Sequence, residues 1–217
     1  MSSESVFLTR LRLNGRSRQV RSEVGSPYEM HRTLVRGVTS TAGSPDAQAA
    51  AIVNARMLFR VDGVTPRGEV ITLVQTRIVP DWRALEGLDG YLLGAPATRE
   101  LRLDVPTGMR LAFRLRANPT VKREGKRLGL YREDEQLAWI ARKGDRHGFR
   151  PLTVSANCEA RAQRSQRRGD AVEHLAVRFD GILSVTDPVA LRDAVSGGIG
   201  SAKGFGYGLL SLARVDG

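Results

Sequence analysis

Cysteine is almost absent from this 217-residue chain, because Cys158 is the only one. A single cysteine excludes an internal disulfide and any cysteine-rich zinc site. Long apolar runs are also missing, and none approaches the ~20 residues of a transmembrane helix. Residues 1–5 lack the basic start and apolar centre of a signal peptide. We therefore predict a protein of the reducing cytoplasm, with no membrane among its partners.

Acidic residues are in deficit. The chain carries 34 lysines and arginines against 23 aspartates and glutamates, a net charge of +11. Arginine greatly outnumbers lysine, and guanidinium groups suit phosphate oxygens and stack on bases, so nucleic acid is the leading predicted partner. A GC-rich genome or an acidic protein partner are the alternatives. Genome bias would explain arginine over lysine, but not the excess of positive charge.

The first half of the chain has the pattern strand, helix, strand, strand, short helix and a weak final strand. Apolar residues alternate from Leu8 in the first strand, and two β-branched runs form a hairpin. The expected elements are a strand over 6–13, a helix over 27–39, strands over 57–61 and 70–76, and a short helix or turn from Pro80. Gly or Pro occupies four of the twelve residues from Gly87 to Thr98, so we expect the domain boundary there.

The second half repeats this order. It is expected to hold a strand over 109–116, a helix over 134–146, strands over 152–159 and 175–185, a helix over 187–195 and a strand over 209–214. The order β-α-β-β-α-β is that of the ferredoxin-like fold. We therefore predict an α+β protein of two tandem ferredoxin-like domains, residues 1–94 and 95–217.

The predicted first helix carries an unusual set of side chains. Ser26 is placed to cap it, Pro27 suits its first position, and Glu29 would complete a capping box. At 100° per residue one apolar stripe forms, and His31 falls at its edge. Tyr28, Arg32 and Arg36 then share its exposed border. This arrangement suggests a site, and the alternative is an edge histidine half covered by a neighbouring strand.

Three further segments are rich in basic residues or glycine. We expect residues 122–127 to form a basic loop and residues 161–168 to form a basic hairpin tip. The loop over 197–208 matches neither the dinucleotide fingerprint nor the Walker pattern, because Lys203 stands where a third glycine is needed and no Gly-Lys-Ser/Thr follows. We expect this loop, with Lys203, to approach a phosphate backbone. The alternative is a long connection in which glycine only relieves strain.

Metal-ligating patterns are missing as well. The other histidines, His147 and His174, stand apart from His31, and no cluster of His, Asp or Glu has metal-ligand spacing. We therefore expect no metal and no other cofactor. If the chain cleaves RNA, the ribose 2′-hydroxyl should be the nucleophile. A histidine near neutral pKa would move the proton, and basic groups would hold the developing charge.

Three separated motifs resemble, in order, those of the CasE family, the CRISPR repeat endoribonucleases of type I-E systems. They are Tyr28-Glu29-Met30-His31-Arg32, Phe113-Arg114-Leu115-Arg116-Ala117-Asn118-Pro119, and the run from Gly198 to Leu210. The resemblance extends from Phe7 to Ala213. The resemblance implies two ferredoxin-like domains and metal-independent cleavage of precursor CRISPR RNA at the 3′ base of the repeat hairpin. The products would carry a 2′,3′-cyclic phosphate, or its opened form, and a 5′-hydroxyl.

The resemblance also implies roles and partners. His31 matches the family's catalytic histidine and Tyr28 its tyrosine, while Arg36 stands where some members have lysine and keeps only a basic role. The expected partners are the CRISPR repeat stem-loop, as precursor and as mature RNA, and the other subunits of the Cascade complex. A non-catalytic RNA-binding subunit is the alternative. The expected RNA-binding residues are Arg32, Arg36, Lys122, Arg123, Lys126, Arg127, Arg161, Arg164, Arg167, Arg168 and Lys203.

Overall fold

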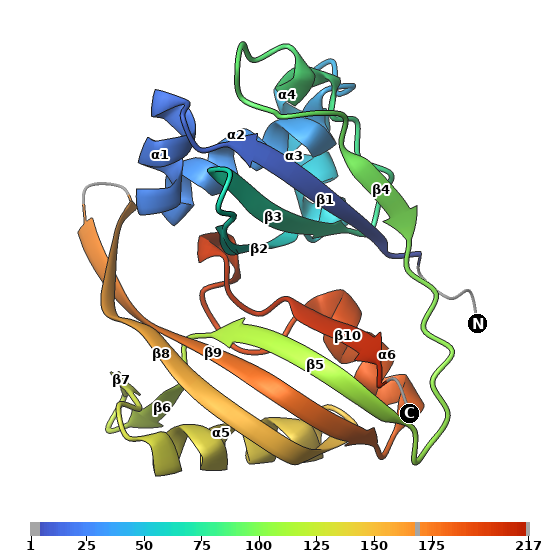
Figure 1. Cartoon of the computed structure of the whole chain (residues 1–217), viewed down its shortest axis with the longest axis vertical. Helices are drawn as coiled ribbons and strands as arrows, with labels where there is room; N and C mark the ends of the chain where they lie inside the picture. The colour runs from blue at the N-terminus through green and yellow to red at the C-terminus, as the bar shows by residue number, and fades with distance from the viewer. Residues whose placement is uncertain (1–4, 168–169, 216–217) are drawn as a thin grey trace. The chain divides into compact units, whose positions relative to one another are not determined.

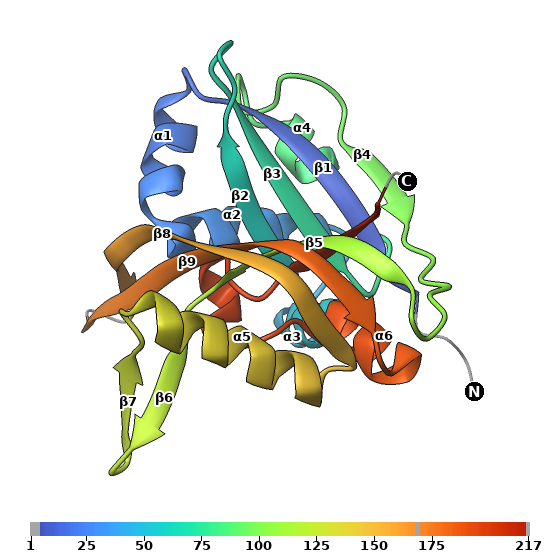
Figure 2. The same cartoon turned by 60° about the horizontal axis from the view of Figure 1, so that its bottom comes forward.

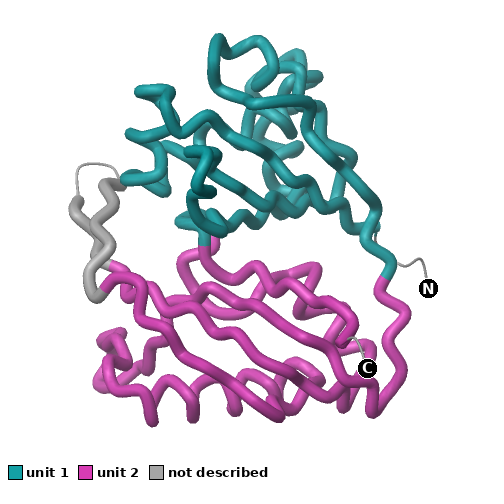
Figure 3. The backbone as a smooth tube through the Cα atoms, viewed as in Figure 1, with its two compact units in different colours: residues 1–102, 204–206 teal, residues 103–203, 207–217 magenta. Residues whose placement is uncertain are grey.

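The computed structural model describes residues 5–167 and 170–215, with the backbone alone described over 161–167 and 170–173. Contacts divide the chain into two compact units (Figure 3). The first comprises residues 1–102 with 204–206, and the second comprises 103–203 with 207–217. No helix in the described part of the chain is both long and apolar enough to cross a membrane.

The first unit is built on a four-stranded antiparallel sheet of order β2-β3-β1-β4 (Figure 1). Its strands are β1 (Phe7–Asn14), β2 (Leu58–Val64), β3 (Glu69–Thr76) and β4 (Ala97–Glu100). In β1 the side chains of Thr9, Leu11 and Leu13 are buried, and the arginines between them are exposed. This is the alternation that the sequence predicts, and the strand order is that of a ferredoxin-like fold.

Four helices belong to this unit: α1 (Arg18–Gly25), α2 (Pro27–Thr39), α3 (Pro45–Ala55) and α4 (Arg83–Glu86). The apolar stripe of α2, which includes Met30 and Leu34, packs with Leu11, Leu13 and Val74 of the sheet in one core. Packing of this stripe, rather than helix propensity, accounts for the stability of a 13-residue helix. The stripe also fixes which face of α2 stays accessible, and that face carries the candidate site.

The second unit repeats the arrangement with a sheet of order β10-β5-β9-β8 (Figure 1). Its strands are β5 (Arg110–Ala117), β8 (Phe149–Arg167), β9 (Asp170–Val185) and β10 (Leu210–Arg214). The helices are α5 (Glu133–Arg146) and α6 (Pro188–Gly197). A short 3₁₀ turn, η1 (Lys203–Phe205), begins at Lys203 of this unit, and its Gly204 and Phe205 are counted with the first unit. Figure 2 shows β5, β9 and β8 of this sheet, with α5 next to β8. Trp139 of α5 stacks on Phe179 of β9, with ring centroids 5.7 Å apart. The prediction of two ferredoxin-like units is confirmed.

Helices α1 and α3 and a two-stranded hairpin were not predicted. Helix α1 forms over Arg18–Gly25, where the sequence predicts no helix, and its buried side chains are Val20 and Glu23. Helix α3 is alanine-rich and mostly exposed, so it has no apolar stripe, but Ser44 caps it by accepting a hydrogen bond from Ala47 N. Residues 122–127, expected as a basic loop, lie in the hairpin of β6 (Thr120–Arg123) and β7 (Lys126–Gly129). Its turn residues Glu124 and Gly125 both have positive φ, as a type I′ turn requires.

The capping box predicted for α2 is wrong. Pro27 does occupy the first turn, but the Ser26 side chain makes no capping hydrogen bond. The Glu29 carboxylate instead accepts from Arg32, one turn further along the helix. The sequence predicts a domain boundary after residue 94. In the structure β4 (Ala97–Glu100) pairs with β1, and the contacts divide the chain after Arg102.

Candidate functional site

His31 lies on α2 where the accessible face of the helix meets its buried stripe. The imidazole is half-buried, and its ring centroid is 6.2 Å from that of Phe59 on β2. The backbone of Gly204 approaches from the glycine-rich segment, since a Cβ placed there would lie 4.0 Å from His31 Nε2. The ring is thus flanked by an aromatic side chain and by a residue without a side chain.

Tyr28 precedes His31 by three residues, so the two side chains are neighbours on the helix surface. The phenol ring is half-buried, with its centroid 6.3 Å from that of Phe205. Gly204 and Phe205 belong to the predicted glycine-rich loop, which therefore supplies contacts to both residues of the site. Sequence reasoning assigned this loop to a phosphate backbone and missed its contacts with α2.

Burial lowers the pKa of His31 below its ordinary value. Desolvation disfavours the charged imidazolium, so the neutral ring is the resting form at neutral pH. A neutral imidazole accepts a proton, and its conjugate acid returns one, which is the pair of states that general acid–base catalysis uses. A phenol beside it supplies a hydrogen-bond donor.

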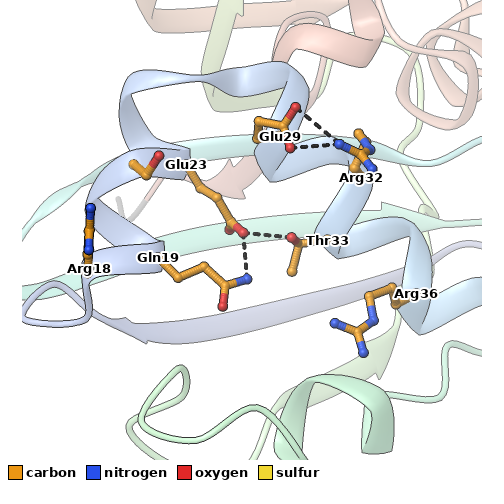
Figure 4. A pocket seen from close by; sticks show the side chains of 8 residues that line it. Arg18, Gln19, Glu23, Glu29, Arg32, Thr33 and Arg36 are labelled. Atoms are coloured by element: carbon orange, nitrogen blue, oxygen red, sulfur yellow. Dashed lines mark hydrogen bonds and ion pairs between the residues drawn. The ribbon is translucent and has the colours of Figure 1, made fainter.

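Arg32 and Arg36 line a cavity of about 790 Å³ on the side of α2 that faces α1 (Figure 4). On an ideal helix they are rotated by about 100° and 140° from His31. Arg18 of α1 faces the same cavity, whereas Arg32 also pairs with Glu29 at 2.9 Å. The structure therefore separates what the spacing grouped on one border: the imidazole lies beside Phe59 and Gly204, and the guanidiniums lie at this cavity.

A buried carboxylate, that of Glu23, also lines this cavity. Glu23 is 4% exposed and accepts hydrogen bonds from Gln19 Nε2 at 2.8 Å, from Thr33 Oγ1 at 2.6 Å and from the Tyr91 hydroxyl at 2.5 Å. Burial and the neighbouring carboxylate raise the pKa of Tyr91. These bonds tie α1 to α2 and to the segment after α4. Nothing in the spacing of the sequence indicated this network.

The predicted basic residues of the second unit separate into two groups. Lys122, Arg127 and Lys203 line a second cavity, whereas Arg123 and Lys126 do not. Lys203 Nζ also donates to the Gly197 carbonyl at the end of α6, at 2.5 Å. Arg161, Arg164 and Arg167 lie in β8, but their side chains are outside the described part of the structure, as is the whole of Arg168.

Two histidines outside α2 have local partners. His174 Nδ1 is 3.1 Å from Asn118 Nδ2, and its ring meets that of Tyr207 edge to face. His147 is the C-cap residue of α5. Burial and the neighbouring Lys143, Arg146 and Lys203 lower the pKa of His147. Within residues 5–167 and 170–215, no three His, Cys, Asp or Glu side chains gather in a group that could hold a metal ion.

The chain matches one family of proteins over nearly its whole length. A family model described as CRISPR associated protein covers residues 6–214. The CRISPR-associated endoribonuclease Cse3 of Thermus thermophilus is 34% identical over 221 residues, which cover 96% of this chain and 100% of that protein. The Cascade subunit CasE of Escherichia coli K12 is 38% identical over 129 residues, which cover 54% of this chain and 64% of that protein.

Solved structures agree with these matches. The structure of Thermus thermophilus Cse3 bound to an RNA representing a pre-cleavage complex has a TM-score of 0.81 with this chain. The two are 33% identical, and the match covers 97% of this chain and 100% of the other.

Proposed function

The chain belongs to the CRISPR-associated protein family of Cse3 and CasE, and on that premise we propose that it is an endoribonuclease that processes CRISPR RNA. Its substrate is the precursor, which it binds at the repeat stem-loop and cleaves at the 3′ base of the hairpin. It then stays on the product as a Cascade subunit. The name of the Escherichia coli relative supports the last step. We place it in the cytoplasm, where its RNA is made.

The reaction needs a proton carrier at the scissile phosphate. The ribose 2′-hydroxyl attacks phosphorus, the O2′–P bond forms, and the P–O5′ bond breaks. The products are a 2′,3′-cyclic phosphate and a 5′-hydroxyl, so one proton leaves O2′ and one joins O5′. A histidine with a pKa near neutrality serves either transfer, and DNA, which lacks the nucleophile, would not be cut.

One observation carries the assignment: a half-buried imidazole, His31, stands beside a phenol, Tyr28, on the accessible face of α2. The Tyr28 hydroxyl orients the 2′-hydroxyl or a phosphate oxygen. Arg32 and Arg36 are phosphate contacts on the neighbouring side of the helix. Arg161, Arg164, Arg167 and Arg168 are proposed to lie against the RNA stem, and Arg123 and Lys126 add positive charge to the same unit.

The test is cleavage of repeat RNA by wild type and by His31→Ala in excess chelator. We expect wild type to cut and the variant to bind without cutting, because binding rests on other residues. Gln48→Ala, on the exposed face of α3, serves as the control that cuts like wild type. Dependence on added Mg²⁺, or continued cutting by His31→Ala at the same bond, would contradict the proposal.

RNA with a 2′-deoxy sugar before the scissile phosphate should be bound and left intact. Cleavage of that RNA would exclude the 2′-hydroxyl mechanism. If wild type binds the repeat tightly and never cuts it, the chain is instead a non-catalytic RNA-binding subunit.

A further inference from the structure

The second unit contains a cavity of about 400 Å³ with an unusually one-sided charge. Three segments converge on it: the β6–β7 hairpin, the last turn of α5 and the glycine-rich connection after α6. Among the described residues that line it, none is aspartate or glutamate. Its basic side chains are Lys122, Arg127, Lys143, Arg146, His147 and Lys203.

The hairpin aims two of its four basic residues at this cavity. Lys122 pairs directly with Arg127 across the hairpin, and Arg123 pairs with Lys126. Successive side chains of a strand point to opposite faces, and directly opposed residues share a face. Lys122 and Arg127 therefore lie on the cavity face, and the other pair lies on the far face. The positive φ of Glu124 and Gly125 fixes this register.

The end of helix α5 also lines the cavity. Lys143 follows Trp139 by four residues, and its Nζ lies 5.3 Å from the centroid of the Trp139 ring. Arg146 and His147 follow by a further three and four residues, so one face of the helix presents all of them. The cation–π contact orients Lys143 without neutralising its charge.

These cations repel one another. Burial, followed by Arg146, Arg142 and Arg127, lowers the pKa of Lys143. The pKa of His147 is lowered in the same way by burial and by Lys143, Arg146 and Lys203. Like charges gathered in a recess without carboxylates cost free energy that a bound anion would recover.

A polar group in the cavity wall is also incomplete. Ser201 Oγ is buried and has no hydrogen-bond partner among the described residues. Buried hydroxyl groups are normally hydrogen-bonded, and a phosphate oxygen is an acceptor of the kind this donor lacks.

We propose that this cavity binds the phosphodiester backbone of an unpaired nucleotide in the RNA that flanks the repeat stem. The inference rests on the proposed RNA-processing function, which supplies the polyanion. A volume near the lower end of the ~300–1,000 Å³ of small-molecule sites suits one nucleotide, whereas a duplex is too wide to enter. The hairpin, the end of α5 and Lys203 then act together on one strand.

The two pairs on the hairpin provide a matched test. Lys122→Glu with Arg127→Glu reverses the cavity pair, and Arg123→Glu with Lys126→Glu makes the same change of charge on the opposite face. Affinity is measured for two uncleavable 2′-deoxy RNAs, the repeat stem-loop alone and the stem-loop with its single-stranded flanks. Circular dichroism reports whether both variants fold, and a Lys122→Gln, Arg127→Gln variant repeats the measurement with milder changes.

We expect the cavity-pair variant to lose roughly tenfold or more in affinity for the flanked RNA relative to its loss for the stem alone. Its salt slope for the flanked RNA should fall by about 1.4, since each single-strand phosphate contact contributes about 0.7. The opposite-face variant should weaken both RNAs equally, as a change of net charge does. The variant Lys122→Arg with Arg127→Lys keeps both positive charges and should bind both RNAs with the affinity of wild type.

Equal losses for the two pairs, or equal losses for the two RNAs, would overturn the inference. The measurement does not depend on cleavage. If wild type binds neither RNA, the proposed function itself is contradicted. If wild type binds tightly and the two pairs of substitutions have the same effect, only the proposed binding site in the cavity is contradicted.

Discussion

The Tyr91 hydroxyl donates a hydrogen bond of 2.5 Å to the Glu23 carboxylate, across 68 residues of sequence. The same carboxylate accepts from Gln19 and Thr33, so a single buried side chain links α1, α2 and the segment after α4. Glu23 and Thr33 line the same cavity as Arg32 and Arg36. The hydrogen bonds of Glu23 therefore help to set the shape of that cavity.

Replacement of Glu23 by Gln should destabilise the protein by about 1–3 kcal/mol. The amide NH₂ would face donors that need an acceptor, and a buried group would be left unpaired. Chemical denaturation measures the loss. Glu29→Gln is the matched control, because Glu29 is half exposed and pairs only with an exposed Arg32. A similar loss in the two variants would contradict the role given to Glu23.

The imidazole of His31 should titrate below the ~6.5 of an exposed histidine, because burial disfavours its charged form. The folded-state pKa is then lower than the unfolded one. The stability that the neutral His31 ring contributes is fully present above its pKa in the unfolded state. It is lost as the pH falls through its pKa in the folded state. NMR titration of the three histidines, with His31→Asn to assign the signal, measures the midpoint.

Bound 2′-deoxy repeat RNA should raise that midpoint, since a nearby phosphate favours the imidazolium. The other histidines serve as internal references. A midpoint at or above the ordinary value in the free protein would contradict the burial argument. A titration midpoint of His31 that does not change when RNA binds would place His31 away from the phosphate.

Arg36→Ala should weaken RNA binding and reduce its salt dependence. Loss of one phosphate contact lowers the slope of log affinity against log salt by about 0.7–0.9. Titrations at several salt concentrations measure this slope. Arg83→Ala is the control, because Arg83 is exposed and is paired with Asp81. An unchanged slope for Arg36→Ala would remove Arg36 from the proposed phosphate contacts.

Gly37→Ala should cost about 1–3 kcal/mol of stability, as overpacking of a core does. A Cβ at Gly37 would lie 2.3 Å from the Trp82 ring. Trp82 cannot easily withdraw, since its indole Nε1 donates to Thr9 Oγ1 at 3.2 Å. Gly25→Ala, with open space at the end of α1, should leave the thermal midpoint unchanged or slightly raised. Equal thermal midpoints for the two variants would show that the Trp82 ring moves aside without a loss of stability.

Periodicity was enough to predict the strong elements. The stripe of Met30, Leu34 and Val38 placed α2 correctly, and alternation placed β1 and β5, because in each case burial of one face dictates the residue pattern. The elements without a buried face were not predicted, because they show no such residue pattern. Neither α3 nor the β6–β7 hairpin buries a face, so caps and positive φ angles decide them.

The sequence by itself determined the charge, the two repeats of β-α-β-β-α-β and the presence of His31 and Tyr28 on one accessible helix face. Those features depend on composition and on neighbours a few residues apart. The tertiary structure decided which distant groups meet: Glu23 with Tyr91, Phe205 with Tyr28, and the hairpin with the end of α5. Such contacts join residues far apart in the chain, and no local spacing encodes them.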